Sequence, residues 1–241
     1  MKSQQLNTTS PAISFVLFLL LLIGATLQLR CKVANTEPEP PIQQDLNSSF
    51  KGIGDLPGGR FHSEALGISD DGKVTIGRSS SARFEEEGFF RAVRDTLIVL
   101  QGAAGAPVSS EPRALTPNGE IIAGKTASAR GIEAFRLTQA RGMEGLGDLP
   151  GGTFHSIAFD VSADGAIVVG FGNTAQGSEA FIWDATNGMR NLKSVLVAGG
   201  LSEVERWRLI EATGISADGR IIVGNGTNPN GQNEGWIIEL H

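Results

Sequence analysis

Several residue types are scarce in this 241-residue sequence, and each scarcity excludes a class of protein. Tyrosine is absent, aromatic residues make up 6% of the chain, and there is one cysteine. A single cysteine permits neither an intrachain disulfide nor a cysteine-rich zinc site. Basic residues number 20 against 26 acidic ones, so the net charge is −6. Binding to nucleic acid requires a basic surface, and we therefore expect no nucleic-acid partner.

Glycine, in contrast, is abundant, with 32 residues in the chain. This is about twice its usual share. Each glycine inside a helix costs about 1 kcal/mol relative to alanine, so the composition excludes a coiled coil or a helical bundle. The glycines have no three-residue period, which excludes collagen. The composition predicts an all-β chain with glycine at its turns.

The N-terminal region predicts export and membrane attachment. Residues 1–12 are polar, and residues 13–29 form an uncharged, strongly apolar stretch. Such a stretch is typical of a secretory signal or a signal-anchor helix. Cleavage stays open, but the small-residue site is weak, so we favour an uncleaved anchor to the cell membrane. Residues 30–49 form a proline-rich linker that would tether an exported domain outside the cytoplasm, in the periplasmic or extracellular space.

Residues 50–241 contain an internal repeat. The segment Gly54–Ser63 returns as Gly147–Ser156, at an offset of 93 residues. Shorter periods of 47, 46 and 54 residues separate four turn glycines, and each of these is followed five residues later by a second glycine. An acidic residue, a small residue and an aromatic residue come next in each unit. The turn glycines are Gly72, Gly119, Gly165 and Gly219, and the second glycines are Gly77, Gly124, Gly170 and Gly224.

Each unit has the pattern of a small antiparallel sheet. Asp-Gly or Asn-Gly between short apolar runs is a strong hairpin signal, because both turn positions favour positive φ. The aromatic marker opens a third strand, and a fourth follows another turn. Four short strands in about 46 residues are typical of a β-propeller blade. The sequence therefore predicts an all-β, four-bladed propeller over residues 50–241, preceded by one hydrophobic helix.

The ends of the repeat region predict how the ring closes. The last unit stops after its third strand, at 237–240, and the first begins with a fourth strand at 51–53. Pairing of this N-terminal strand with the C-terminal blade would complete one blade from both ends. Two alternatives stay open, namely an open solenoid and an incomplete ring that pairs with another copy.

The repeat markers resemble a known family. The stretches Leu146–Gly152, Ser162–Gly170 and Glu179–Trp183, followed by Gly188-Met189, are similar to the HAF repeat of predicted extracellular bacterial proteins. The resemblance covers nearly all of residues 50–241. It implies export and tandem β-repeats, and it supplies no catalytic or binding residues.

Candidate site residues occupy equivalent repeat positions. His62 and His155 would face each other across a four-bladed ring, with Asp55 and Asp148 in matching loops. These four side chains are candidates for binding, and the histidines are weak candidates for an ion site. Alternatively, the aspartates cap their own turns and the histidines only begin strands.

One further candidate lies in an insertion. The last linker carries eight extra residues, including Trp207, and an irregular loop on a regular scaffold is a common place for partner contact. Alternatively, Trp207 packs on a blade.

The leading functional hypothesis is a binding or scaffold module for an extracellular protein or glycan. No nucleophile elbow, phosphate loop or zinc-protease motif is present in the sequence, and no cofactor is required by it. The alternative is a hydrolase or lyase directed at a glycan or peptide, with its site at the channel mouth of the propeller. A third hypothesis is a purely structural surface protein.

Overall fold

A computed structural model describes residues 49–84, 87–92, 96–101 and 109–240 of the chain. The chain divides into two units, Met1–Phe50 and Lys51–His241. Only Ser49 and Phe50 of the first unit are described, so the predicted helix at 13–29 lies outside the described residues. Within the described residues no helix is long and apolar enough to cross a membrane.

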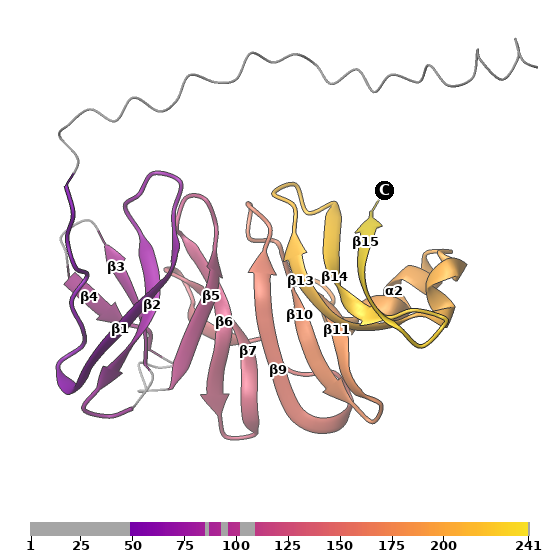
Figure 1. Ribbon diagram of the computed structural model, residues 1–241, viewed down its shortest axis with the longest axis horizontal. Coiled ribbons are helices and arrows are strands. Elements are labelled where there is room, and N and C mark those ends of the chain that lie inside the picture. Colours follow the sequence, from indigo (N-terminus) through magenta and orange to yellow (C-terminus); the bar gives the residue numbers. More distant parts are fainter. Residues whose placement is uncertain (1–48, 85–86, 93–95, 102–108, 241) are drawn as a thin grey trace, which may run out of the picture. The chain divides into compact units, whose positions relative to one another are not determined.

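The second unit is built from antiparallel strands, which confirms the predicted all-β class (Figure 1). Each repeat forms one sheet, numbered here in chain order. Sheet 1 contains β1 (Gly58–Ile68), β2 (Thr75–Ser81), β3 (Glu87–Ala92) and β4 (Thr96–Val99). Sheet 2 contains β5 (Ser110–Leu115), β6 (Ile121–Ser128), β7 (Gly131–Thr138) and β8 (Gly142–Gly145). Sheet 3 contains β9 (Gly151–Val161), β10 (Ile167–Thr174), β11 (Gly177–Asp184) and β12 (Gly188–Asn191). Sheet 4 contains β13 (Arg208–Ile215), β14 (Ile221–Thr227) and β15 (Asn233–Glu239).

Two features depart from a plain succession of four sheets. One parallel residue pair, Ile132 with His155, joins sheets 2 and 3 into a continuous eight-stranded sheet. The predicted insertion folds into α2 (Leu192–Ala198) and the 3₁₀ helix η2 (Ser202–Arg206), which lie between sheets 3 and 4 in the chain. The Asn191 side chain caps α2 by accepting a hydrogen bond from the Ser194 N–H at 3.0 Å.

The repeated Asp-Gly segments form the hairpin turns that their sequence predicts. In sheet 3, the Ser162 hydroxyl donates to the Asp164 carboxylate at 2.6 Å and accepts from the Ile167 N–H at 3.0 Å. Gly165 follows with φ of 69°, a conformation that glycine adopts without steric cost. Equivalent bonds form in sheets 1, 2 and 4, so one local network turns the chain in each repeat.

Successive sheets pack face to face through apolar cores. We call the side of a sheet that meets the next sheet its forward face, and the side that meets the preceding sheet its rear face. Between sheets 1 and 2 the core contains Ile76, Ile122 and Phe135. Between sheets 2 and 3 it contains Ala123, Ala134, Ala158, Val161 and Phe181. Between sheets 3 and 4 it contains Val169, Ile182, Ala212, Ile222 and Trp236, with Leu192, Leu196 and Val204 from the insertion.

The expected closure of the ring is not formed among the described residues. Residues 49–56 lie in no strand, and β15 pairs with β14 alone. Two hydrogen bonds connect the N-terminal segment to sheet 1, as the equivalent Ser156–Gly147 bond connects the segment before β9 to sheet 3. The Ser63 hydroxyl donates to the Gly54 carbonyl at 2.6 Å, and the Leu56 N–H donates to the Ser79 hydroxyl at 2.9 Å. Among the described residues, β15 therefore gains no fourth strand from residues 51–53.

Candidate functional site

Each sheet has a β-bulge at the same place in its first strand. In sheet 3, Val169 pairs with Asp160 and Gly170 pairs with Ala158, which leaves Phe159 without a partner. The registers of β1, β5 and β13 skip one residue in the same way. A bulge turns its extra residue out of the regular alternation of side chains. The bulged residues are Leu66, Arg113, Phe159 and Thr213.

The second repeat glycine is explained by this bulge. A Cβ added to Gly170 would overlap the carbonyl oxygen of Ile157 and press on the Phe181 ring. The glycines at the equivalent positions of the other sheets meet the same obstacle, the carbonyl oxygens of Glu64, Glu111 and Glu211. Glycine is thus required opposite each bulge because the backbone of the first strand approaches too closely for any side chain.

The four bulged residues line one cavity of about 400 Å³, which we call the axial cavity. Its other lining residues are Glu111, Pro112 and Glu211. All of these residues come from the first strand of a sheet. Four strands that lie far apart in the sequence therefore meet around one space, as the innermost strands of a propeller do.

A buried carboxylate organises the charge beside this cavity. Glu111 is largely buried and lies 2.7 Å from the Arg113 guanidinium, 3.0 Å from the Lys125 ammonium and 3.5 Å from the Arg78 guanidinium. Arg78 also bonds to Glu64 at 2.9 Å, and this hydrogen bond lowers the pKa of the Glu64 carboxyl. Pairing offsets the cost of burying these charges and fixes the orientation of Arg113.

Aromatic rings extend from the cavity into sheet 3. The Arg113 guanidinium lies 5.2 Å from the centroid of the Phe159 ring, within the range of a cation–π interaction. Phe159 contacts Phe171, with ring centroids 5.7 Å apart, and Phe171 contacts His155 at 5.6 Å. The axial cavity thus combines an oriented cation, an aromatic face, the Thr213 hydroxyl and the Glu211 carboxylate.

The predicted aspartate and histidine of sheet 3 have local structural contacts. The Asp148 carboxylate accepts hydrogen bonds from the backbone N–H groups of Leu149 at 2.8 Å, His155 at 2.6 Å and Asn173 at 3.1 Å. Both carboxylate oxygens are therefore engaged in fixing the Gly-Asp-Leu-Pro-Gly-Gly loop. The alternative that this aspartate caps its own turn accounts for these bonds.

The equivalent residues of sheet 1 are more exposed. His62 lies in β1, and its ring nitrogen is 3.4 Å from the Glu64 carboxylate. Asp55 is half-buried in the loop before β1. In the part of the chain that the structure describes, no group of three or more His, Cys, Asp or Glu side chains is arranged to hold a metal ion. The binding role of Asp55, His62, Asp148 and His155 stays a prediction.

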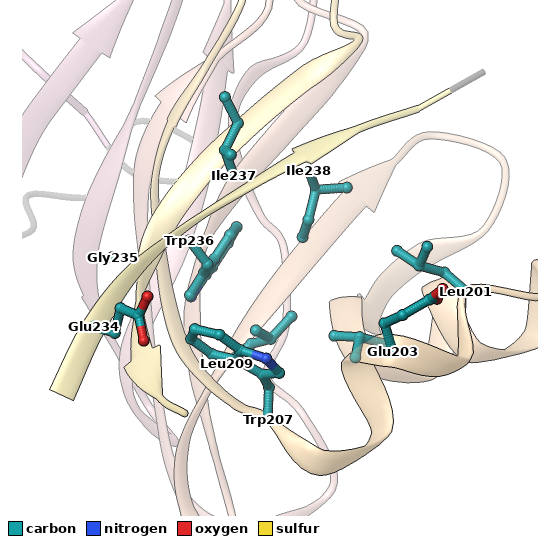
Figure 2. A pocket seen from close by; sticks show the side chains of 10 residues that line it. Leu201, Glu203, Trp207, Leu209, Glu234, Gly235, Trp236, Ile237 and Ile238 are labelled. Atoms are coloured by element: carbon teal, nitrogen blue, oxygen red, sulfur yellow. The ribbon is translucent and has the colours of Figure 1, made fainter. Parts of the chain in front are cut away.

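Trp207 lies at the end of η2 and lines a groove of about 410 Å³ beside β15 (Figure 2). We call this the Trp207 groove. The Trp207 ring packs against the core between sheets 3 and 4, while the Lys193 ammonium bonds to its carbonyl at 2.7 Å. Trp236 lies in the same groove, and its buried indole nitrogen has no hydrogen-bond partner among the described residues. The groove is otherwise lined mainly by Leu201, Val204, Leu209, Ile237 and Ile238.

The axial cavity was not predicted from the sequence. The repeat spacing aligns its four bulged positions, but their residue types differ completely, so no repeated motif marks them. The second glycine of each repeat was the available signal, because a glycine within a strand often marks a bulge.

Comparison with known proteins identifies the fold. No protein-family model matches the chain, and no curated protein sequence matches it. A solved structure of a putative TolB from Agrobacterium tumefaciens is 18% identical, with a TM-score of 0.52 over 74% of this chain and 58% of that one. The chain has a TolB-like β-propeller fold. A second TolB, from Acinetobacter baumannii, is 13% identical with a TM-score of 0.48, over 74% of this chain and 41% of that one. The chain thus spans about half the length of these neighbours.

Proposed function

We propose that this protein is an exported, membrane-tethered β-propeller module that binds a partner outside the cytoplasm. Its four sheets act as blades, and the axial cavity is the binding site. The observation that carries the proposal is the convergence of Leu66, Arg113, Phe159 and Thr213 on one cavity through four equivalent bulges. A bulge repeated at the same place in four sheets positions side chains for a purpose other than core packing.

The chemistry of the cavity defines the class of partner. A guanidinium held by Glu111 offers a fixed cation, and the Phe159 face offers a flat apolar surface. Such a combination suits the charged and polar groups of a protein surface or a glycan. The uncharged stretch at 13–29 and the resemblance to HAF repeats support export of the module.

The experiment places a photoreactive amino acid at Thr213 in the full chain, expressed in the cells that produce it. Irradiation is expected to give a covalent adduct that mass spectrometry identifies as a protein or glycan. The double variant Arg113→Ala/Phe159→Ala should lose most of this adduct. An impermeant protease added to cells whose outer membrane, where present, has been removed should digest the module, since the proposal places it outside the cytoplasm.

The matched control carries the photoreactive residue at Thr186, in the exposed turn between β11 and β12. No adduct at position 213, or equal adducts at both positions, would refute binding at the axial cavity. Resistance to protease in cells without an outer membrane barrier, but not in lysed cells, would refute export.

A further inference from the structure

The forward face of sheet 4 is exposed, although the equivalent face of sheet 3 is buried. Val169 and Ile182 are cross-strand partners on the forward face of sheet 3, where the exposed fraction of Ile182 is 6%. Their repeat equivalents in sheet 4, Val223 and Ile237, are also cross-strand partners. Ile237 is 71% exposed because the described residues provide no sheet to cover it. An apolar pair of this kind on a sheet face is typical of an interface.

The rear face of sheet 1 is also exposed, although the equivalent face of sheet 3 is buried against sheet 2. Val161 packs on sheet 2 from the rear face of sheet 3 and is 7% exposed, whereas its equivalent in sheet 1, Ile68, is 62% exposed. Ala65 is exposed in the same way, although its equivalent Ala158 is fully buried. The molecule therefore displays both halves of the interface that joins its own successive sheets, one at each end of the row.

The N-terminal segment can be compared with its repeat equivalent in the same way. Residues 49–52 precede residues 142–145, which form β8, by the repeat offset of 93. β8 is the fourth strand of sheet 2 and pairs with β7, the equivalent of β15. Met143 of β8 is 5% exposed in the core between sheets 1 and 2, whereas its equivalent Phe50 is 99% exposed. The segment has the register of a fourth strand for sheet 4, and in the part of the chain that the structure describes no strand pairs with β15 on the side that a fourth strand would occupy.

We propose that sheet 4 of one copy binds sheet 1 of a second copy, head to tail, and that residues 49–52 of the second copy add a fourth strand to β15. By repeat register, Phe50 then lies beside Ile238, as Met143 lies beside Leu137. Ile238 lines the Trp207 groove (Figure 2), so in this arrangement we expect the groove to receive the Phe50 ring of the second copy. Strand addition to an open edge is an established mode of protein recognition.

Hydrogen bonds between successive sheets predict the equivalent hydrogen bonds between the two copies. The turn of sheet 1 donates from the Asp70 N–H to the Pro117 carbonyl at 2.8 Å, and the turn of sheet 3 donates from Ala163 to Ala217 at 3.0 Å. The next bond in this series runs from the Ala217 N–H to the Asp70 carbonyl of the second copy. Similarly, the Ala134 N–H of sheet 2 donates to the Ser156 hydroxyl of sheet 3, which predicts a bond from the Gly235 N–H to Ser63 of the second copy.

A second copy fits these surfaces better than closure within one chain. Both end faces are exposed in the same molecule, and within the described residues no extensive contact links sheet 1 to sheet 4. A head-to-tail contact either closes into a ring or continues as a chain. Two copies that exchange strands reciprocally would contain eight sheets, which lies within the usual range of about four to eight propeller blades. The inference rests on the sheets being blades and does not depend on the ligand of the axial cavity.

The test uses cysteine pairs in the full chain, with Cys31→Ser as background. By repeat register, Lys51 pairs with Ile237 as Glu144 pairs with Arg136. Two differently tagged chains, one with Lys51→Cys and one with Ile237→Cys, are produced together, extracted in detergent and oxidised. A disulfide-linked heterodimer is expected. The matched control replaces Ile237→Cys by Thr186→Cys in an exposed turn, and it should give no crosslink.

Closure within one chain is distinguished by a chain that carries both cysteines. If this chain gives an internal disulfide while the two single-cysteine chains give no heterodimer, the inference is overturned. A full chain that light scattering in detergent finds to be monomeric at all concentrations also overturns it. A dimer or larger assembly supports it, provided that Ile237→Asp raises the dissociation constant at least about tenfold and Ile237→Val does not.

Discussion

The junction between sheets 3 and 4 and the two end faces are built from equivalent residues but differ completely in exposure. At the junction, Val169 and Ile182 lie in a core that the insertion enlarges with Leu192 and Leu196. At the forward face of sheet 4, the same repeat positions are open to solvent. The difference teaches that the burial of a side chain in this fold is decided by whether a neighbouring sheet is present, and not by the sheet to which the residue belongs.

The largest expected effect on stability comes from the second repeat glycine, which has the same surroundings at the junction and in sheet 4. Gly170→Ala at the junction and Gly224→Ala in sheet 4 should each destabilise the fold by about 3 kcal/mol or more, because the new methyl group overlaps a carbonyl oxygen in both cases. Urea unfolding followed by circular dichroism measures the change. Gly199→Ala is the control, since its Cβ would meet only ordinary contacts at 3.4 and 3.5 Å. A tolerant Gly224 would show that the end sheet is looser than the inner one.

The next prediction tests the exposure difference itself. Ile182→Ala should lower the free energy of unfolding by about 2–4 kcal/mol, because it leaves a cavity in the core. Ile237→Ala should change it by less than about 0.5 kcal/mol at a dilution where copies are separate. Denaturation of both variants at two protein concentrations provides the measurement. Equal losses from the two variants at high dilution would mean that sheet 4 is covered within a single chain.

The sequence predicted the repeated architecture well because its determinants are local. Asp164 and Gly165 form the turn through bonds that span only a few residues, and the same chemistry recurs in each repeat. Ring closure depended instead on how sheets 1 and 4 meet, which local patterns do not specify. The segment that follows the predicted strand at 51–53 is bonded to sheet 1 through Gly54 and Leu56, and the equivalent bond between Ser156 and Gly147 shows that such a contact belongs to the repeat itself and does not decide closure.

The candidate site was less predictable than the fold. Asp148 and His155 were candidates because they repeat, and the bonds of Asp148 show that this aspartate fixes its own loop. The sequence did not reveal the residues of the axial cavity, because the residue type at the bulged position differs from repeat to repeat. Trp207 packs against the core, as the alternative interpretation expected, and it also lines a groove, so its role in partner contact stays a prediction.

A hydroxyl between sheets provides a smaller test. Ser156 is fully buried, donates to the Gly147 carbonyl and accepts from the Ala134 N–H at 2.9 Å, so Ser156→Ala should cost about 1–3 kcal/mol. Its equivalent Ser63 is half-buried and bonds to Gly54, and Ser63→Ala should cost about 0.5–1 kcal/mol. Thermal unfolding of the two variants is the measurement. Ser63→Ala would cost more stability than Ser156→Ala only if a partner buried Ser63 in stronger contacts than those that Ser156 makes between sheets 2 and 3.

The smallest expected effect is on the pH dependence of stability, which should differ between an exposed turn and a buried junction. Hydrogen bonds from Lys73 and Ser69 lower the pKa of Asp71 to about 2, below the ordinary value of 3.8. Its contribution to stability is therefore complete above pH 3.8 and is lost as the pH falls through about 2. Burial raises the pKa of the Asp160 carboxyl, which lies beside sheet 4. The effect of Asp160 on stability therefore has the opposite pH dependence, and its stabilising contribution is lost as the pH rises through the raised pKa.

Unfolding midpoints between pH 2 and pH 6 measure both effects. Asp71→Asn should reduce the loss of stability at the acid end, and Asp160→Asn should flatten the change at higher pH. Identical pH profiles for the native chain and both variants would contradict these assignments.

At each bulge, the residue that the fold requires is separate from the residue that lines the axial cavity. Leucine, arginine, phenylalanine and threonine all occupy the bulged position, although the glycine opposite it does not vary among the four repeats. Replacement of a bulged residue alters the lining of the cavity without disturbing the cores between sheets. A protein engineer, or evolution by duplication of repeats, can therefore change the lining of the axial cavity one quarter at a time.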